Sequence, residues 1–301
     1  MKIIPGSQIA QRKLDNLKQR IEVLETKPKL GIVQVGFDKP TEIYVSHKIN
    51  DAKAIGIDCE HFVFDQISFD EIQNLIKNLN YRNDIHGYII QLPISIDGDL
   101  KKLVSSIIPS KDIDGMNPKN LGLVWQSSSD FHFVPATVLG VLECLLYTAI
   151  YDDAKYSSEE TDREYANKQL SNYLQGKDIV IINDSIIVGR PLAGVLLNQK
   201  ASVSICNKYT KNLTAYLEKA DIVVSATGVA ELIHSEQVKN NAVLIDVGIS
   251  RTQQGLKGDF KFESFFDTDC WITPVPNGVG PLTRVMLLEN LYTAFIHQVG
   301  K

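Results

Sequence analysis

The sequence predicts two α/β domains, each built on a mostly parallel sheet, with a cleft between them. Short apolar runs alternate along the chain with longer amphipathic segments, and this alternation is typical of βαβ units. The chain has 301 residues, of which 44% are hydrophobic, which is enough for two buried cores. We place the first domain at residues 1–139 and the second at 140–281, and we expect the C-terminal helix, 282–301, to return to the first domain.

The first domain begins with a helix and continues as alternating strands and helices. Apolar residues recur at helical spacing over residues 7–26, and the apolar run at 30–36 predicts a buried strand. A helix that carries Tyr44 and Lys48 follows, and we expect Gly56 to end it. The later predicted elements are a strand near 59–64, a helix near 69–79, a strand at 87–92 and a helix near 99–106.

Four polar residues at the ends of strands or in loops form the predicted site of this domain. Tyr44 and Lys48 are four apart, so both lie on one face of their helix. Gln91 ends the strand at 87–92, and Asp114 lies in a turn after Pro109. A tyrosine and a lysine at this spacing are usually a surface pair. However, α/β proteins place their sites at the carboxyl ends of strands, and a lysine that loses water there can take part in proton transfer.

The second domain is predicted to be a Rossmann-type dinucleotide-binding domain. An apolar helix at 137–150 leads into it, and a polar insertion near 151–175, exposed and partly helical, follows. The strand at 178–182, the turn at 183–189 and the helix at 191–198 together present backbone N–H groups to a diphosphate. The turn is not a G-x-G-x-x-G sequence, so this signal is weak by itself. Further strands are expected at 201–206, 223–228 and 243–248, the last two ending in glycine.

Several longer blocks of sequence occur in a recognisable order. They are Tyr44-Val45-x-x-Lys48, Gln91-Leu92-Pro93, Pro109-x-Lys111-Asp112-Ile113-Asp114-Gly115, Ser185-Ile186-Ile187-Val188-Gly189-Arg190-Pro191, Ala220-Asp221-Ile222-Val223-Val224-Ser225-Ala226-Thr227-Gly228, Ile245-Asp246-Val247-Gly248-Ile249 and 272–283. In this order the blocks resemble those of the bifunctional methylenetetrahydrofolate dehydrogenase/cyclohydrolase enzymes of one-carbon metabolism. No single block is decisive, but the ordered set is highly specific.

The resemblance implies that the first domain binds folate and is catalytic. It implies oxidation of 5,10-methylenetetrahydrofolate to the methenyl cation, followed by hydrolysis to 10-formyltetrahydrofolate, within one-carbon metabolism and purine biosynthesis. Lys48 would activate water and assist proton transfer, Gln91 would position Lys48, Tyr44 would contact the substrate, and Asp114 would accept hydrogen bonds from the pterin. Pro276 and Gly278 would also contact the substrate.

The resemblance also implies a nicotinamide cofactor in the second domain. The residues assigned to it are Asn183, Asp184, Ser185, Gly189, Lys208, Thr227, Gly228 and Ile249. The family usually has Gly-Arg-Ser at 183–185, and its arginine suits the 2′-phosphate of NADP. Asp184 replaces that arginine and would repel the phosphate, which suggests NAD, although Lys208 supplies a cation nearby. Asn277 replaces a glycine of the family, and its side chain could crowd the nicotinamide or the folate.

Charge and cysteine usage exclude several other classes of protein. A net charge of −5 argues against nucleic acid as the partner. The four cysteines are widely spaced, so we expect neither a metal site nor disulfides. We see no membrane span and expect a cytoplasmic protein, and the resemblance implies a homodimer. Two alternatives stay open, namely another two-domain Rossmann oxidoreductase and a cyclohydrolase-only or non-catalytic relative that binds folate or nucleotide.

Overall fold

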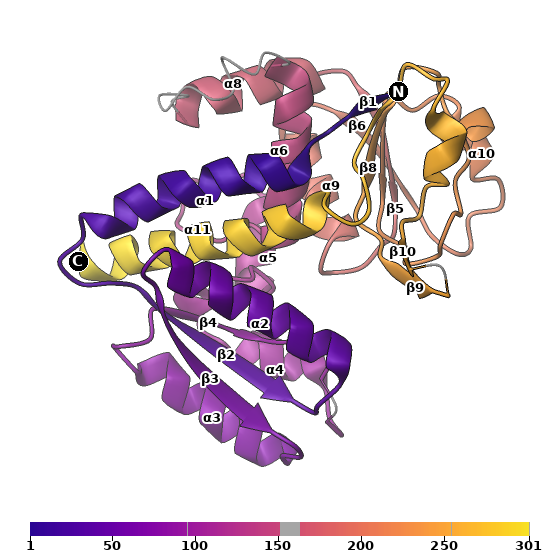
Figure 1. Cartoon of the computed structure of the whole chain (residues 1–301). Helices are drawn as coiled ribbons and strands as arrows, with labels where there is room; N and C mark the ends of the chain where they lie inside the picture. Colours follow the sequence, from indigo (N-terminus) through magenta and orange to yellow (C-terminus); the bar gives the residue numbers. More distant parts are fainter. Residues whose placement is uncertain (95, 151–162, 254, 301) are drawn as a thin grey trace. The chain divides into compact units, whose positions relative to one another are not determined.

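The computed structural model confirms the predicted fold class of two α/β units. It describes residues 1–94, 96–150, 163–253 and 255–300. Unit 1 comprises Met1–Arg12 and Thr137–Thr283, and unit 2 comprises Lys13–Ala136 and Arg284–Lys301. Two helices, α1 (Gly6–Glu22) and α11 (Val279–Val299), contribute residues to both units (Figure 1).

Unit 2 is built on a three-stranded parallel sheet. Its strands are β2 (Lys29–Val35), β3 (Asp58–Phe64) and β4 (Gly87–Ile90), in the order β3-β2-β4. The strand that follows β2 in sequence, β3, is therefore added on one side of β2, and the next strand, β4, is added on the other side. In a parallel sheet, the carboxyl ends on either side of such a switch point form the usual ligand-binding edge. Here that edge lies at the ends of β2 and β4.

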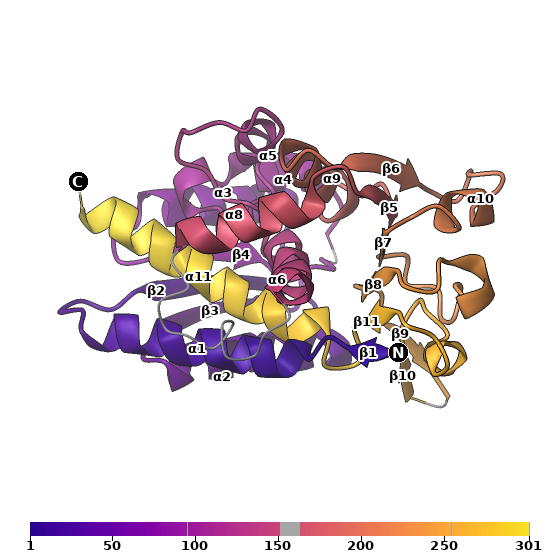
Figure 2. The ribbon, with the colours of Figure 1, turned by 90° about the horizontal axis from the view of Figure 1, so that it is seen from above.

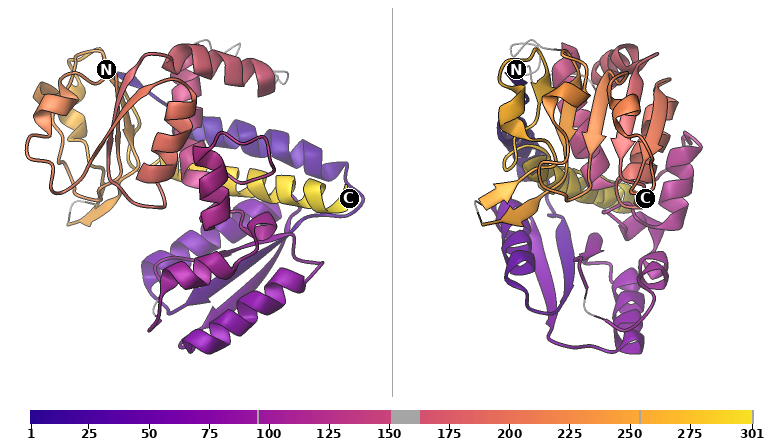
Figure 3. Two further views of the ribbon diagram at one scale, coloured as in Figure 1. Left: turned by 180° about the vertical axis from the view of Figure 1, so that it is seen from behind. Right: turned by 90° about the vertical axis from the view of Figure 1, so that its right-hand side faces the viewer.

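Helices cover both faces of this sheet (Figures 1 and 3). Helices α3 (Phe69–Tyr81) and α4 (Leu100–Ser106) pack on one face, around a core that includes Ile76, Tyr88 and Leu103. Helix α2 (Lys39–Ala54), on the other face, begins where the Asp38 carboxylate accepts a hydrogen bond from the Thr41 N–H at 3.0 Å. It ends two residues before Gly56, which has a positive φ of 82°.

The segment after α4 is held against β4 by two buried charged residues. It contains a short 3₁₀ turn, η1 (Pro109–Lys111), and then α5 (Pro118–Trp125). Lys111 donates hydrogen bonds to the carbonyls of Leu79 and Arg82, where α3 ends. Asp112 accepts hydrogen bonds from the Asn117 N–H at 2.6 Å and the Asn120 amide at 2.9 Å. These contacts fix the turn that carries Asp114.

Helix α11 completes unit 2 from Arg284 onward. The Asn290 amide donates hydrogen bonds to the carbonyls of Ile113, at 2.8 Å, and Val134, at 3.0 Å. Helix α11 thus also holds the turn that carries Asp114.

Unit 1 contains a six-stranded parallel sheet in the order β1-β11-β8-β7-β5-β6, seen along its row of strands in Figure 2. The strands are β1 (Lys2–Ile3), β5 (Asp178–Ile182), β6 (Ser202–Cys206), β7 (Ile222–Ser225), β8 (Val243–Asp246) and β11 (Trp271–Ile272). The switch point of this sheet lies between β5 and β7, because β6 is added on one side and β7 on the other. The strands predicted at 223–228 and 243–248 end earlier than expected, at Ser225 and Asp246, before the glycines at 228 and 248.

The N-terminal residues differ from the sequence expectation. We placed residues 1–12 with the first domain, but β1 pairs with β11, and Ile4 N–H donates to the Ile272 carbonyl at 2.9 Å. A two-residue strand has no periodicity of its own, so only its distant partner defines it.

Helices and short elements complete unit 1. They are α6 (Ala136–Ile150), α8 (Arg163–Leu174), α9 (Gly189–Asn198), α10 (Thr214–Leu217), a hairpin of β9 (Ser250–Thr252) and β10 (Gly255–Lys257), and the 3₁₀ turns η2 (Ser235–Gln237) and η3 (Phe262–Phe265). The predicted insertion at 151–175 is helical over α8, and its residues 151–162 lie outside the described part of the chain. None of the helices in the described ranges is long and apolar enough to cross a membrane.

Replacing Asp112 tests the buried carboxyl that holds the turn before Asp114. Burial raises the pKa of Asp112 to about 7, whereas an aspartate in an unfolded chain titrates near ~3.9. The folded chain binds this proton more tightly, so the stability it adds is present at low pH and is lost as pH rises from about 4 to about 7. We expect Asp112→Asn to remove this loss, which amounts to at most about 1.4 kcal/mol per pH unit.

The measurement is the free energy of unfolding in urea across that pH range, with Asp65→Asn, at an exposed position, as the matched control. If the parent and Asp112→Asn lose stability equally as pH rises, Asp112 does not carry the proton.

Candidate functional site

Three of the four predicted catalytic residues come together at the carboxyl edge of the sheet in unit 2. Lys48 lies on α2, which follows β2, and Gln91 directly follows β4. The Lys48 Nζ donates a hydrogen bond to the Gln91 Oε1 at 2.9 Å, and the Gln91 Nε2 donates to the Leu92 carbonyl at 2.7 Å. The backbone contact fixes the amide so that its oxygen faces the lysine. The Gln91 amide is therefore held between the Leu92 carbonyl and the Lys48 ammonium group.

Asp114 is close enough to Lys48 for the two charges to influence each other. Although parts of both side chains remain accessible, burial is the largest influence on both groups. Burial lowers the pKa of Lys48 and raises the pKa of Asp114, while the attraction between the two charges opposes both shifts. Both residues are thus moved towards their neutral forms, which suits groups that exchange protons.

Tyr44 lies one turn before Lys48 on α2, with 43% of its surface exposed. Large aromatic side chains on a surface are available to stack on a planar ligand. An exposed tyrosine beside a desolvated lysine fits contact with a substrate better than a role in the core.

A second group of candidate residues lies at the switch point of the sheet in unit 1. Asn183 follows β5 with φ of 146°, a conformation that favours glycine. Its amide donates to the Ala226 carbonyl, and its Oδ1 accepts from the Ser185 N–H at 2.6 Å. A Cβ on Gly189 would lie 1.7 Å from the Asn183 carbonyl oxygen, so only glycine fits there. The asparagine thus keeps the tight turn that leads into α9.

Within the described ranges, the exposed Asp184 side chain makes one long hydrogen bond. Its Oδ2 accepts a hydrogen bond from the Asn207 amide at 3.4 Å. Lys208 is exposed, and its Nζ lies 5.1 Å from the ring centre of Tyr209. Arg190, to which the sequence analysis gave no role, donates from Nε to the Asp184 carbonyl at 2.8 Å. Its position directly after Gly189 was the only signal in the sequence.

The remaining predicted contacts of unit 1 lie in loops after β7, β8 and β11. The Thr227 N–H donates to the Asp259 Oδ2 at 2.7 Å, and Ser225 donates to the same oxygen. Asp259 is fully buried and was missed by the sequence analysis, since an aspartate after a glycine usually signals a turn. Gly228, with φ of 69°, and Ile249, 38% exposed, follow β7 and β8.

The loop after β11 contains the predicted substrate contacts of unit 1, Pro276 and Gly278. Pro276 is exposed, and a Cβ on Gly278 would lie 2.4 Å from the Pro274 carbonyl oxygen. Asn277, between them, has φ of 79°, a conformation that glycine adopts without strain and that asparagine tolerates better than most other residues. Its carbonyl accepts a hydrogen bond from the Ser7 N–H at 3.0 Å.

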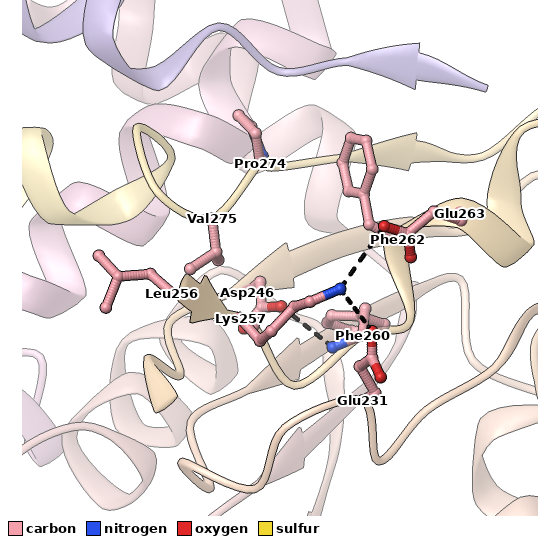
Figure 4. A pocket seen from close by; sticks show the side chains of 10 residues that line it. Glu231, Asp246, Leu256, Lys257, Phe260, Phe262, Glu263, Pro274 and Val275 are labelled. Carbon is pink, nitrogen blue, oxygen red and sulfur yellow. Dashed lines mark hydrogen bonds and ion pairs between the residues drawn. The ribbon is translucent and has the colours of Figure 1, made fainter. Parts of the chain in front are cut away.

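A pocket of about 180 Å³ in unit 1 is separate from these residues (Figure 4). Its walls include Lys257, whose Nζ pairs with Glu231 at 2.9 Å and Glu263 at 3.7 Å. None of the predicted catalytic or cofactor-binding residues lines it, and its lysine is already paired with two carboxylates of the pocket wall. No group of three or more His, Cys, Asp or Glu residues able to hold a metal occurs within the described ranges.

Both units match models of a single protein family. Residues 4–114 match the catalytic domain of tetrahydrofolate dehydrogenase/cyclohydrolase, and residues 166–299 match the NAD(P)-binding domain of the same family.

Individual proteins are similar over the whole chain. The bifunctional protein FolD of Hydrogenobaculum sp. (strain Y04AAS1) is 37% identical over 300 residues, which is 99% of this chain and 100% of that protein. Among solved structures, the FolD methylenetetrahydrofolate dehydrogenase/cyclohydrolase of Campylobacter jejuni is 34% identical, with a TM-score of 0.86 over 98% of both chains. The FolD dehydrogenase-cyclohydrolase of Trypanosoma brucei, solved with NADP cofactor and inhibitor, is 28% identical, with a TM-score of 0.86 over 99% of this chain and 98% of that one.

Proposed function

This chain belongs to the tetrahydrofolate dehydrogenase/cyclohydrolase family, and from that premise we infer that it is an enzyme with both activities. It oxidises 5,10-methylenetetrahydrofolate to the 5,10-methenyl cation with NAD(P)⁺, and it hydrolyses that cation to 10-formyltetrahydrofolate. Both steps belong to one-carbon metabolism. The observation that carries this function is the 2.9 Å hydrogen bond between Lys48 and Gln91, next to Asp114, in the region that matches the catalytic domain.

We assign the proton transfer of the hydrolysis to Lys48. Water adds to the methenyl carbon and loses one proton, which leaves a neutral hydroxyl adduct. The bond from that carbon to N5 of the folate then breaks as N5 takes up a proton and the hydroxyl group loses its own, which forms the formyl group on N10. A neutral amine can accept the proton, and burial lowers the pKa of Lys48 in that direction. Gln91 holds the amine in place, because its own amide is fixed by the Leu92 carbonyl.

Asp114 and Tyr44 are the proposed substrate contacts in unit 2. The pterin ring has an amino group and a ring N–H group, and a carboxylate can accept hydrogen bonds from both. No described residue donates a hydrogen bond to the Asp114 side chain, so its oxygens are available to a ligand. Tyr44 is exposed one turn from Lys48 and can stack on the flat part of the folate.

The turn after β5 fits a dinucleotide. Gly189 lets α9 begin directly against the Asn183 backbone, and the helix has no side-chain cap there. The Arg190 N–H donates to the Ser185 carbonyl at 3.0 Å and Pro191 has no N–H, so Gly189 is the first-turn donor that we assign to a diphosphate. The nicotinamide, when bound, supplies the hydride acceptor. The residues that we assign to the cofactor are Asn183, Asp184, Ser185, Gly189, Lys208, Thr227, Gly228 and Ile249.

We propose that the enzyme is relaxed between the two cofactors or prefers NAD. The Asp184 carboxylate is exposed and would repel a 2′-phosphate, whereas it can accept a hydrogen bond from a free ribose hydroxyl. Lys208 offers one exposed cation that already contacts Tyr209. Arg190 lies beside the Asp184 backbone, and its guanidinium is the group at this turn that would most favour the 2′-phosphate of NADP.

The family resemblance is the support for three further properties. We propose that the enzyme is a cytoplasmic homodimer and that its product serves purine biosynthesis. Sedimentation equilibrium of the purified chain tests the dimer, and a monomer at micromolar concentration would contradict it.

Replacing Lys48 tests the hydrolytic role. Lys48→Met should lower the rate of methenyltetrahydrofolate hydrolysis by roughly a hundredfold or more, which is the usual contribution of a general acid or base. Lys53→Met, at an exposed position of the same helix, is the matched control and should hydrolyse at the parental rate. A folded Lys48→Met enzyme with parental hydrolysis would refute the role.

Replacing Asp114 tests the pterin contact. Asp114→Ala leaves donors of the bound pterin unpaired, so folate binding should weaken by about 1–3 kcal/mol. Titration calorimetry with a folate ligand measures this, and Asp130→Ala, in an exposed loop of the same unit, is the control. Unchanged affinity in Asp114→Ala would remove Asp114 from the site.

Replacing Asp184 tests the cofactor preference. Asp184→Asn removes the repulsion, and Asp184→Arg adds a phosphate partner, so kcat/KM should shift towards NADP in that order. Rates with NAD and NADP at one ionic strength give the ratio. A parent that strongly prefers NADP, with a ratio that neither substitution moves, would mean that Asp184 does not face the ribose.

A further inference from the structure

An ion pair in unit 2 joins α11 to α2 one turn beyond Lys48. The Arg284 Nε donates to the Asp51 Oδ2 at 2.6 Å, and the two side chains are 25% and 26% exposed. Asp51 follows Lys48 by three residues on α2, so both side chains lie on one face of the helix. Asp51 thus holds the Arg284 guanidinium on the side of α2 that carries Lys48. At that position a positive charge lowers the pKa of Lys48, in the same direction as burial.

Lys48 is held between two opposite charges and one neutral amide. Gln91 accepts its hydrogen bond from the end of β4. Asp114, in the turn after η1, favours the ammonium form, and Arg284, from α11, disfavours it. No described acidic residue lies within ion-pair distance of the Lys48 Nζ, as the salt bridges nearby all involve other cations. Burial is the largest cause that lowers the pKa of Lys48, and Asp114 and Arg284 adjust that pKa in opposite directions.

We propose that Arg284, held by Asp51, is a positioning residue that favours the neutral amine of Lys48 and directs it towards Gln91. The inference rests on the proposed role of Lys48 in hydrolysis. A guanidinium suits this task because it stays charged at every working pH, so its repulsion is constant. The same repulsion keeps the lysine from turning along its own helix towards Asp51, which already has a cation.

A purely structural ion pair is the competing explanation. Pairs that retain a quarter of their exposure contribute little to stability, and a structural role would not alter the ionisation of Lys48. The two explanations therefore differ in how the pH dependence responds to removal of the Arg284 charge.

The test compares two neutral variants, Arg284→Gln and Arg284→Met, with the charge-conserving Arg284→Lys. Arg20→Gln is the matched control, because Arg20 pairs with Glu289 on the same helix α11 and is not among the charges that act on Lys48. Two quantities are measured in each folded protein. One is the pH profile of methenyltetrahydrofolate hydrolysis, and the other is the pKa of Lys48 from NMR of the ¹³C-dimethylated lysines, assigned with Lys48→Arg.

We expect both neutral variants to raise the pKa of Lys48 and to move the acidic limb of the rate profile to higher pH. Below that pKa, hydrolysis should fall by roughly three- to tenfold, since each pKa unit changes the neutral fraction tenfold. Arg284→Lys should return both quantities towards the parent, and Arg20→Gln should move neither.

A Lys48 pKa that stays constant in both neutral variants would overturn the inference. If the proposed function itself is wrong, the result is different. Lys48→Met then hydrolyses methenyltetrahydrofolate at the parental rate, with or without the Arg284 charge.

Discussion

The hydrogen bond between Lys48 and Gln91 is the contact on which the site of unit 2 depends. It joins the helix after β2 to the end of β4, and these elements meet only because β2 lies between β3 and β4 in the sheet. A lysine with a neutral partner in a desolvated position is destabilised as an ammonium ion. The strand order thus places Lys48 where burial lowers its pKa, and this is the basis of the proton-transfer role that we propose.

Buried charges in unit 2 divide into those that are fully paired and those that are not. Lys111 donates to two backbone carbonyls, and Asp112 accepts from two N–H groups. Lys48 has a single neutral acceptor, and Asp114 receives no hydrogen bond from the described residues. Lys111 and Asp112 therefore fix the backbone of the turn, whereas Lys48 and Asp114 keep hydrogen-bonding capacity that a ligand can use.

In unit 1 the candidate residues also lie at the switch point of a parallel sheet. Its switch point, between β5 and β7, carries a turn closed by Asn183 and Gly189 instead of by charged side chains. The start of α9 has no side-chain cap and is where we propose that a diphosphate binds, whereas Asp184 in the turn and Lys208 after β6 are exposed. The tight part of the turn is therefore fixed by sterics, whereas the residues to which we assign cofactor choice are exposed charges.

The sequence by itself determined the α/β class, most strand and helix positions, and the residues at strand ends, because periodicity and turn chemistry are local properties. It also placed Tyr44 and Lys48 on one helical face. Only the tertiary structure decided that β1 joins β11, that Arg190 reaches Asp184, and that Arg284 pairs with Asp51. The partners in the first and last of these contacts lie 269 and 233 residues apart, and no local pattern encodes a contact made by folding distant segments together.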